Sequence, residues 1–442
     1  MQVKNTKKMS FVTTKVKKEF TSGQLTSYSG LSVISDFIKH IGIYDSLNEW
    51  FPTVRHNASL FSTAQVLSSI VLSNLCGVHR MSRMENFTHD PLVSRLLGLP
   101  KNIDEDTIRG HLSLMGERGA RHLHASLLKF NSAEASRCGL SQITLDCDST
   151  GLTTYGNQQG AEAGYNPHKK GAKGYHPLLC FLSESKLLLN SWFRPGSAYT
   201  SNGILDFMNE TLSALPEAIK RVFFRADSGF FNGDLFDLLE KGGHSYLVKV
   251  KLKNLKDLLQ KQSWEKVDAK TATCKFTHRC GNWQKGRAFY GVRILKEYVQ
   301  KEFFGEMELI PVYDYFCYCS NLKGLDAIKI HRLYGERSES ENWIEQAKNG
   351  LCAGRTITRD FWVNDILWQL SQLAYNISIM IRYVTDFWAW RQEHTTFRRW
   401  FICIPGKVVK SARRITVKMP KEYYWKQKWR DFEQQLACKI AV

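Results

Sequence analysis

The 442-residue sequence lacks an uncharged apolar stretch of about 18 residues, which a helix needs to span a membrane. Its most apolar segment, residues 361–384, is interrupted by Asn, Asp, Gln and Arg, so we expect a buried amphipathic helix instead. The basic first twenty residues also lack the apolar run of a secretory signal. These absences predict a cytoplasmic protein with no membrane partner.

The cysteines form no recognisable framework. There are eleven of them, an odd number with irregular spacing, which argues against the paired disulfides of a small secreted protein. A second possibility is a zinc site of four thiolates, formed by Cys274, Cys280, Cys317 and Cys319. Their spacing departs from the usual C-x2-C pairs, and the last two alternate in a strand-like run. We therefore expect neither disulfides nor zinc.

Acidic residues are in deficit, with 42 Asp and Glu against 61 Lys and Arg, a net charge of +19 and a pI near 9.4. Such a surplus attracts polyanions, and nucleic acid is the commonest of them because each neutralised phosphate releases a counterion. From residue 391 onward, 13 Lys and Arg stand against 4 Asp and Glu and are interleaved with Trp and Tyr. This pattern suits nucleic-acid binding, although a solvated basic face explains it equally well.

Periodicity and composition change along the chain and suggest several regions. The helical second region carries many Arg residues and could hold a DNA-binding helix-turn-helix; a module for packing or dimerisation is the alternative. We predict a basic flexible arm over 1–30, a helical domain over 31–135, a first core part over 140–250, a β-rich insertion over 251–322, a second core part over 323–390 and a basic C-terminal region over 391–442.

The order of elements between residues 141 and 249 indicates the fold. A buried strand (SQITLDCDST) is followed by two strand-like runs arranged as a hairpin, and then by alternating helices and strands. Three consecutive strands followed by this alternation are the order of the ribonuclease H-like fold. We predict an α/β protein with a ribonuclease H-like mixed sheet and flanking helices, interrupted by a β-rich insertion, plus an all-helical N-terminal domain.

Two aspartates lie at the ends of predicted buried strands, Asp148 in the first and Asp227 in the fourth. A carboxylate in such a place is costly unless it is paired or bound to a cation. Together with Glu341 from a helix they would supply the hard oxygen ligands that Mg2+ prefers. Two Mg2+ ions at ~3.5–4 Å can activate the attacking oxygen and stabilise the leaving one in phosphodiester chemistry. Asp146 shares the strand face of Asp148 and is an alternative first ligand.

A helical stretch, LYGERSESENWIEQAKNG, carries the third carboxylate. In a regular helix its Tyr334, Arg337, Glu341 and Lys348 fall within roughly 60° of one another, along a line of about 21 Å. One carboxylate flanked by a tyrosine and two cations makes a poor hydrophobic face but suits a metal ligand with neighbouring phosphate contacts. A solvated face with an ion pair between Arg337 and Glu341 is the plain alternative.

These features together resemble the signature of a group of bacterial insertion-sequence transposases. The resemblance rests on DST after the first strand, a second Asp at a strand end, and the pattern Y-x2-R-x3-E-x6-K, often called YREK, which fits without gaps. The segments YGNQQGAEAGYNPHKKGAKGYHPLL and IPGKVVKSARRITVKMP are also similar to this group. The resemblance covers about residues 31–435. It implies a DDE recombinase with a ribonuclease H-like core.

The resemblance also implies roles for individual residues. Asp148, Asp227 and Glu341 would be the catalytic residues and would hold two Mg2+ ions, with Mn2+ as an alternative. Arg337 and Lys348 would hold phosphates of the transposon end, and Tyr334 would support the site or contact the DNA backbone. The group places its first ligand directly before a Ser/Thr pair, which favours Asp148 over Asp146.

Further DNA contacts are expected outside the signature. Lys169, Lys170 and Lys173 lie in a glycine-containing loop that could follow a phosphate backbone, although an ordinary exposed loop is the alternative. Trp283, in the insertion, is the candidate for stacking on a flipped base, with core packing as the alternative. A second basic run follows the fifth predicted strand and could track the backbone or be merely solvated; it comprises Lys249, Lys251, Lys253 and Lys256.

The activity implied is cut-and-paste transposition of a mobile insertion sequence. Hydrolysis at the element end would free a 3′-hydroxyl, which would then attack DNA by transesterification. The expected partners are double-stranded DNA, namely terminal inverted repeats and target DNA, and a second subunit when DNA is bound, in the bacterial cytoplasm at the nucleoid. Two rivals are a ribonuclease H-like nuclease without strand transfer and a DNA-binding protein without catalysis. The complete YREK stripe argues against the first, and the presence of all three acidic residues against the second.

Overall fold

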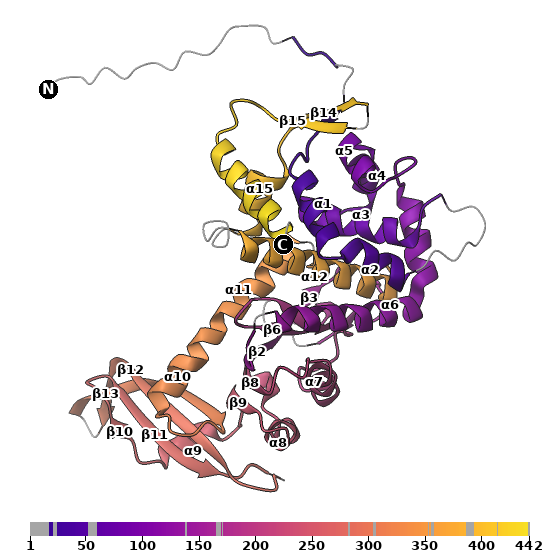
Figure 1. Ribbon diagram of the computed structural model, residues 1–442. Coiled ribbons are helices and arrows are strands. Elements are labelled where there is room, and N and C mark those ends of the chain that lie inside the picture. The colour runs from indigo at the N-terminus through magenta and orange to yellow at the C-terminus, as the bar shows by residue number, and fades with distance from the viewer. Residues whose placement is uncertain are drawn as a thin grey trace, which may run out of the picture.

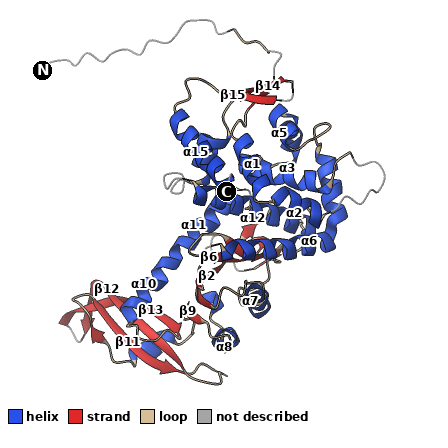
Figure 2. Cartoon of the chain, in the orientation of Figure 1, coloured by secondary structure: helices blue, strands red, loops and turns tan. Residues whose placement is uncertain are grey.

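A computed structural model of the chain describes residues 17–440 apart from 21–23, 52–59, 138, 165–168, 170, 282, 304–305, 352, 355–357, 386–392 and 413. It is a mixed α/β structure in which many helices pack near a large mixed sheet, part of which extends away from the helical body (Figure 1 and Figure 2). The predicted fold class is confirmed at this level. None of the described helices combines the length and the apolar character that crossing a bilayer would require.

Helices dominate the first third of the chain. Their ends follow local signals: Ser62 and Gln65 form a capping box at the start of α3, and Gly77 ends that helix with a φ of 77°, where glycine is favoured. The longest helix, α6, is capped by Asp104 and kinks at Gly116, whose φ is 48°. The helices are α1 (Leu31–His40), α2 (Ile43–Trp50), α3 (Thr63–Cys76), η1 (Met81–Arg83), α4 (Met84–His89), α5 (Pro91–Leu96) and α6 (Glu105–Ser136).

The central sheet is built around one buried strand, β2 (Gln142–Ser149). β2 pairs antiparallel with β6 and parallel with β8, and β8 pairs parallel with β9. The first five long strands therefore lie in the order β7-β6-β2-β8-β9. The remaining elements of this part are β6 (Leu178–Leu182), β7 (Leu188–Trp192), α7 (Ile204–Ser213), β8 (Arg221–Ala226), η2 (Ser228–Phe230), α8 (Gly233–Lys241) and β9 (Ser245–Lys249). A small sheet in the order β3-β5-β4 lies beside them, formed by β3 (Leu152–Thr153), β4 (Glu162–Ala163) and β5 (Lys173–Tyr175).

Alternate residues of the strands enter two different cores. In β6, Leu178, Cys180 and Leu182 pack with α7 and α8, while Leu179 and Phe181 pack on the opposite face. This is the period of two expected of a strand buried on both sides. Because Asp148 is paired with Leu179 in the register, the aspartates of β2 share the second face.

The insertion predicted after the fifth strand is β-rich and continues the same sheet. β13 pairs with β9 through Tyr318 and Lys249, so the sheet has nine strands in all. Its two longest strands form a hairpin that projects from the body of the molecule (Figure 1). One helix, α9, was not expected there. The elements are α9 (Leu255–Gln260), β10 (Glu265–Lys266), β11 (Thr271–His278), β12 (Arg287–Phe303) and β13 (Glu306–Ser320).

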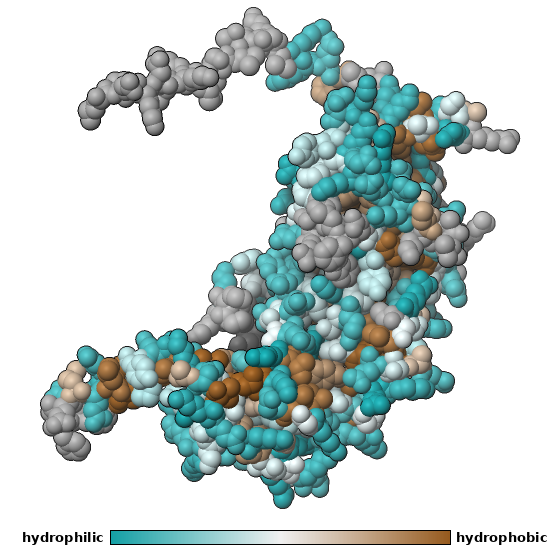
Figure 3. Space-filling view, turned by 60° about the vertical axis from the view of Figure 1, so that its left-hand side comes forward, coloured by the Kyte–Doolittle hydropathy of each residue, from teal (hydrophilic) through white to brown (hydrophobic). Residues whose placement is uncertain are grey.

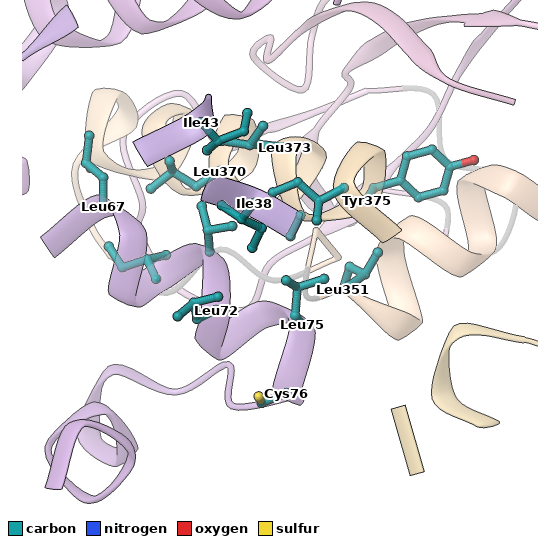
Figure 4. Packing of buried hydrophobic residues seen from close by; sticks show 14 of the residues in the cluster. Ile38, Ile43, Leu67, Leu72, Leu75, Cys76, Leu351, Leu370, Leu373 and Tyr375 are labelled. Atoms are coloured by element: carbon teal, nitrogen blue, oxygen red, sulfur yellow. The ribbon is translucent and has the colours of Figure 1, made fainter. Parts of the chain in front are cut away.

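The helix α12 (Phe361–Val384) joins the two ends of the chain in one core. It is the amphipathic helix expected over residues 361–384, and most of its residues are buried. Leu370 and Leu373 of α12 pack with side chains of α1, α2 and α3, as Figure 4 shows. The N-terminal helices therefore share a hydrophobic core with α12 and with one face of the sheet.

The C-terminal region closes this core and binds the N-terminal segment. α14 (His394–Phe397), the π-helical turn η5 (Arg398–Ile402) and α15 (Lys426–Ile440) pack near α1 and α12. β14 (Gly406–Ser411) pairs with β15 (Arg414–Lys418) and with β1 (Leu25–Thr26). The prediction of an arm over residues 1–30 is therefore wrong for its last part, because the amides of Ser29 and Gly30 donate to carbonyls at 404 and 402.

Asn376 connects α12 to the sheet and to α6. Its side chain donates to Asn131 Oδ1 at 2.9 Å and to the Leu188 carbonyl at 2.8 Å, and it accepts from the Leu188 amide at 2.9 Å. We expect Asn376→Ala to lower the free energy of unfolding by about 2–4 kcal/mol, because three buried polar groups lose their partner. Denaturant titration would measure this loss, with Asn209→Ala, at an exposed position of α7, as the matched control. A loss no larger than in the control would contradict this role.

Asp365, on α12, accepts a hydrogen bond from Gln369 Nε2 at 2.9 Å, yet burial raises its pKa to about 6. A carboxyl with a raised folded pKa binds its proton better folded than unfolded, so stability falls as pH rises from about 4 through 6. We expect Asp365→Asn to stabilise the protein at pH 8, by up to about 3 kcal/mol, and to leave it unchanged near pH 4. Thermal unfolding at both pH values tests this; exposed Asp314→Asn should show no such difference.

Candidate active site

A cleft of about 1060 Å3 opens where the carboxyl ends of β2 and β8 meet the segment that follows α10. The cleft is lined by the three predicted acidic site residues, Asp148, Asp227 and Glu341. The cations that line it include Lys251, Arg337 and Lys348. A smaller cavity of about 310 Å3 shares Asp227 and Glu341 and adds Tyr334 and Lys249. Residues far apart in the sequence therefore meet at this edge of the sheet.

Asp148 is the most deeply buried of the three carboxylates, with 9% of its surface exposed. It accepts from Arg337 Nη1 at 2.9 Å and from the amide of Ser149 at 2.8 Å. Burial raises the pKa of Asp148; Arg337 opposes this, and the negative charge of Asp227 adds to it. One guanidinium therefore does not fully offset the desolvation of this carboxylate.

Asp227 follows β8 directly and begins the short helix η2. Its Oδ1 accepts from the amide of Gly229 at 2.9 Å, as an N-cap. β2 and β8 are parallel, and Cys147 pairs with Ala226 in their register. Asp148 and Asp227 are thus the next residues of neighbouring parallel strands, which explains why both reach one cleft.

Glu341 approaches from the other side of the cleft. Its side chain is 69% exposed, and its Oε1 lies 3.8 Å from Nη2 of Arg337. Arg337, which is itself buried, therefore stands between Asp148 and Glu341. The carboxylate of Asp148 raises the pKa of Arg337, so the guanidinium stays charged.

The helix that carries the YREK residues is irregular. It consists of α10 (Ala327–Gly335), the 3-10 turn η3 (Glu336–Ser338), α11 (Glu339–Glu345) and the π-helical turn η4 (Gln346–Gly350). The prediction of a regular α-helix with about 100° per residue is therefore wrong here. Even so, Arg337, Glu341 and Lys348 all line the cleft.

The other two signature residues have partners inside the protein. Tyr334 packs against Tyr318 at 4.8 Å between ring centroids, and Arg337 lies over its ring at 5.6 Å. Lys348 Nζ donates to Thr150 Oγ1 at 3.0 Å and to the Gly151 carbonyl at 3.2 Å, and burial lowers the pKa of Lys348. Lys348 thus ties η4 to the loop that follows β2.

Asp146 faces a different partner from Asp148. It is fully buried and receives two hydrogen bonds from Arg225, at 2.7 and 2.9 Å. Arg225 also donates to Glu336 Oε2 at 2.8 Å and to the Leu333 carbonyl at 3.0 Å. Asp146 is not among the described residues that line the cleft. It pairs instead with the guanidinium that fastens η3 to the sheet.

The remaining predicted contacts are scattered. Lys169 lies over the ring of Tyr155 at 4.7 Å, Lys173 is exposed at the start of β5, and Lys170 lies outside the described residues. Trp283 packs against Phe231, Phe236 and Phe289 and under Arg287, and it is not among the described residues that line the cleft. In this structure Trp283 is packed among other aromatic side chains, as in the core-packing alternative.

Three residues that line the cavities were not assigned to the site from the sequence. Lys249 and Lys251 line the two cavities, whereas the sequence could not distinguish them from a solvated run. His176 lines the cleft together with the two aspartates, and its Nδ1 lies 2.6 Å from the carbonyl oxygen of Ala198. Burial lowers the pKa of His176, which favours the neutral imidazole. The only sequence signal was a histidine two residues before an apolar strand.

The three carboxylates suit a divalent metal in their chemistry. All are hard oxygen donors, and Asp148 keeps a raised pKa although Arg337 is 2.9 Å away, so it would gain from a further cation. Within the described part of the chain, no three His, Cys, Asp or Glu side chains converge closely enough to hold a metal by themselves. Arg337 lies between Asp148 and Glu341, 2.9 Å from the first carboxylate and 3.8 Å from the second.

Known proteins of similar sequence or structure include transposases. A family model described as transposase DDE domain, group 1, matches residues 9–439. Among proteins with curated descriptions none matches. A cryo-EM structure of a piggyBac transposase synaptic complex with hairpin DNA is similar over 83% of this chain and 76% of that chain, with 14% identity and a TM-score of 0.42.

The assignment of Asp146 to a structural ion pair with Arg225 can be tested by measuring stability. We expect Arg225→Met to lower the free energy of unfolding by about 3–5 kcal/mol, because it leaves Asp146 charged, buried and unpaired. Adding Asp146→Leu should recover most of that loss, since the lone charge is removed. Arg221→Met, at the exposed start of the same strand, is the matched control for denaturant titration. If the double variant is no more stable than the single one, the pairing is not the cause.

Proposed function

The chain belongs to the DDE transposase domain family, and from this premise we propose that it is a metal-dependent DNA transposase acting by a cut-and-paste mechanism. The observation that carries the proposal is the meeting of Asp148, Asp227 and Glu341 in one cation-lined cleft. We propose that its element is a bacterial insertion sequence, and that it acts at the nucleoid. The family membership supports the reaction class, and the cleft supports the choice of residues.

We propose a ribonuclease H-like core for the strands β7-β6-β2-β8-β9. In chain order these are strands three, two, one, four and five, with the first three antiparallel and the last two parallel to the first. The chain order of these elements, three strands and then alternating helices and strands, supports the proposal. The strand arrangement brings the ends of the first and fourth strands together, which is why their aspartates are neighbours.

Asp148, Asp227 and Glu341 would hold two divalent ions, Mg2+ or Mn2+. When bound, such ions supply Lewis-acid activation of the attacking oxygen and stabilise the leaving one. In the proposed reaction, the oxygen of water forms a bond to phosphorus and the 3′-oxygen leaves with a proton as a free hydroxyl. In a second step that hydroxyl attacks a phosphodiester of other DNA, so each bond formed replaces one broken. The protein mainly positions the DNA and the carboxylates.

The cations of the cleft would bind the DNA backbone around the reacting phosphate. Lys249, Lys251 and Arg337 line the two cavities and would neutralise phosphates there. Lys348 would act first as a positioning residue through Thr150, as would Tyr334 beneath Arg337. Lys169, Lys170 and Lys173 would extend this path, and Trp283 would stack on a base only if it left its aromatic packing.

The N-terminal helices would bind the terminal inverted repeats. Their exposed arginines, among them Arg80, Arg83 and Arg118, supply cations for phosphate contacts. Because two element ends must be handled together, we also propose a homodimer on DNA. Both proposals rest on the transposase function and would fall with it.

The proposed function predicts that one carboxylate decides cleavage. Wild-type protein should nick a labelled duplex carrying an element end in the presence of Mg2+, and Glu341→Gln should lower the rate about a thousandfold, roughly 4 kcal/mol at the transition state. Glu339→Gln is the matched control, because Glu339 is exposed two residues earlier on α11. Equal loss in both variants, or cleavage unaffected by Glu341→Gln, would overturn the assignment.

The same reaction separates the transposase from a nuclease. Products in which the labelled 3′-end is joined to a target plasmid are expected from wild-type protein and absent with Glu341→Gln. Nicking without any joined product would leave the active site intact and replace the transposase with a nuclease.

A further inference from the structure

A strongly basic β-ribbon lies at the end of the molecule away from the insertion (Figure 1). It consists of β14 and β15, and residues 406–421 contain six Lys and Arg and no Asp or Glu. The proposed catalytic chemistry does not use it. Figure 3 shows a largely hydrophilic surface over the upper part of the molecule, where this ribbon lies in Figure 1.

The two faces of the ribbon differ in character. Antiparallel register pairs Lys407 with Lys418 and Val408 with Val417, so alternate pairs point to opposite faces. Val408 is 2% exposed and attaches one face to the protein. The opposite face carries Lys407, Lys418 and Arg414, all exposed, together with the hydroxyl groups of Ser411 and Thr416 and the half-buried side chain of Val409. The ribbon therefore presents a mainly polar, cationic face to solvent.

The charges on this face, those of Lys407, Arg414 and Lys418, are not paired with any carboxylate in the described part of the chain. Lys407 and Lys418 are moreover direct cross-strand partners, an arrangement of like charges that destabilises a sheet. Protection of an exposed edge would account for Lys418 on β15, but not for Lys407, since β14 is the middle strand of its sheet.

We propose that the outward face of the β14–β15 ribbon is a second binding site for duplex DNA, with Lys407, Arg414 and Lys418 contacting backbone phosphates. A two-stranded ribbon has the width that the major groove admits, and its hydroxyl groups can donate to phosphate oxygens. Polyanion binding removes the repulsion between the paired lysines. This inference rests on the proposed function, and it gives the C-terminal region a part in holding DNA outside the cleft.

Salt-dependent binding tests the ribbon. With full-length protein and a fluorescent duplex, Arg414→Ala/Lys418→Ala should weaken binding about tenfold or more near 0.1 M salt and lower the slope of log affinity against log salt by about 2. Lys220→Ala/Arg221→Ala is the matched control, since it also removes one exposed Lys and one exposed Arg, at the amino end of β8. The control should keep the wild-type affinity and slope.

A second measurement leaves all the cations in place. Thr416→Cys, in a Cys438→Ser background and labelled with a photocrosslinker, should attach to the duplex, whereas Asn209→Cys should not. Wild-type binding with equal slopes in both double variants and no cross-link at residue 416 would overturn the ribbon site and leave the proposed function standing. Failure of wild-type protein to bind any duplex would overturn the proposed function and this inference with it.

Discussion

The buried carboxylates of β2 set the constraint on which the rest of the structure depends. Two aspartates lie on one face of a central strand, where an unpaired charge would cost several kcal/mol. Each receives a guanidinium from another element, and each guanidinium reaches a glutamate on the irregular helix after α10. These ladders fasten that helix to the sheet and so define the cleft; they are Asp146–Arg225–Glu336 and Asp148–Arg337–Glu341.

The two ladders differ in their access to solvent, and this difference separates structure from chemistry. Asp146 and Arg225 are almost fully buried, so solvent and ligands do not reach this ion pair. Asp148 lines the cleft, and its raised pKa means that Arg337 leaves part of its charge unsatisfied. A group in that state gains from a cation that arrives with a substrate. The open ladder is therefore the one suited to metal and phosphate.

Positive charge is found both in the cleft and on the distant β14–β15 ribbon. The lysines and arginine of the cleft line it together with the carboxylates, and Arg337 offsets part of the cost of burying Asp148. The ribbon lies beyond the core that α12 shares with the N-terminal helices, and its lysines and Arg414 form no ion pair with a carboxylate that the structure describes. A DNA molecule long enough to contact both the cleft and the ribbon would be bound away from the reacting bond as well as at it.

The sequence by itself determined the kind and order of most elements, because strand alternation, helix caps and apolar periodicity are local properties. It also singled out Asp148, Asp227 and Glu341 as candidates, which stay a prediction. Tertiary structure alone decided what depends on distant partners: the pairing of Asp146 with Arg225, the packing of Trp283, and the strand that Leu25 forms beside β14. The partners in these contacts are up to several hundred residues apart in the chain. No local pattern encodes such distances, since they follow from how the sheet and α12 bring the segments together.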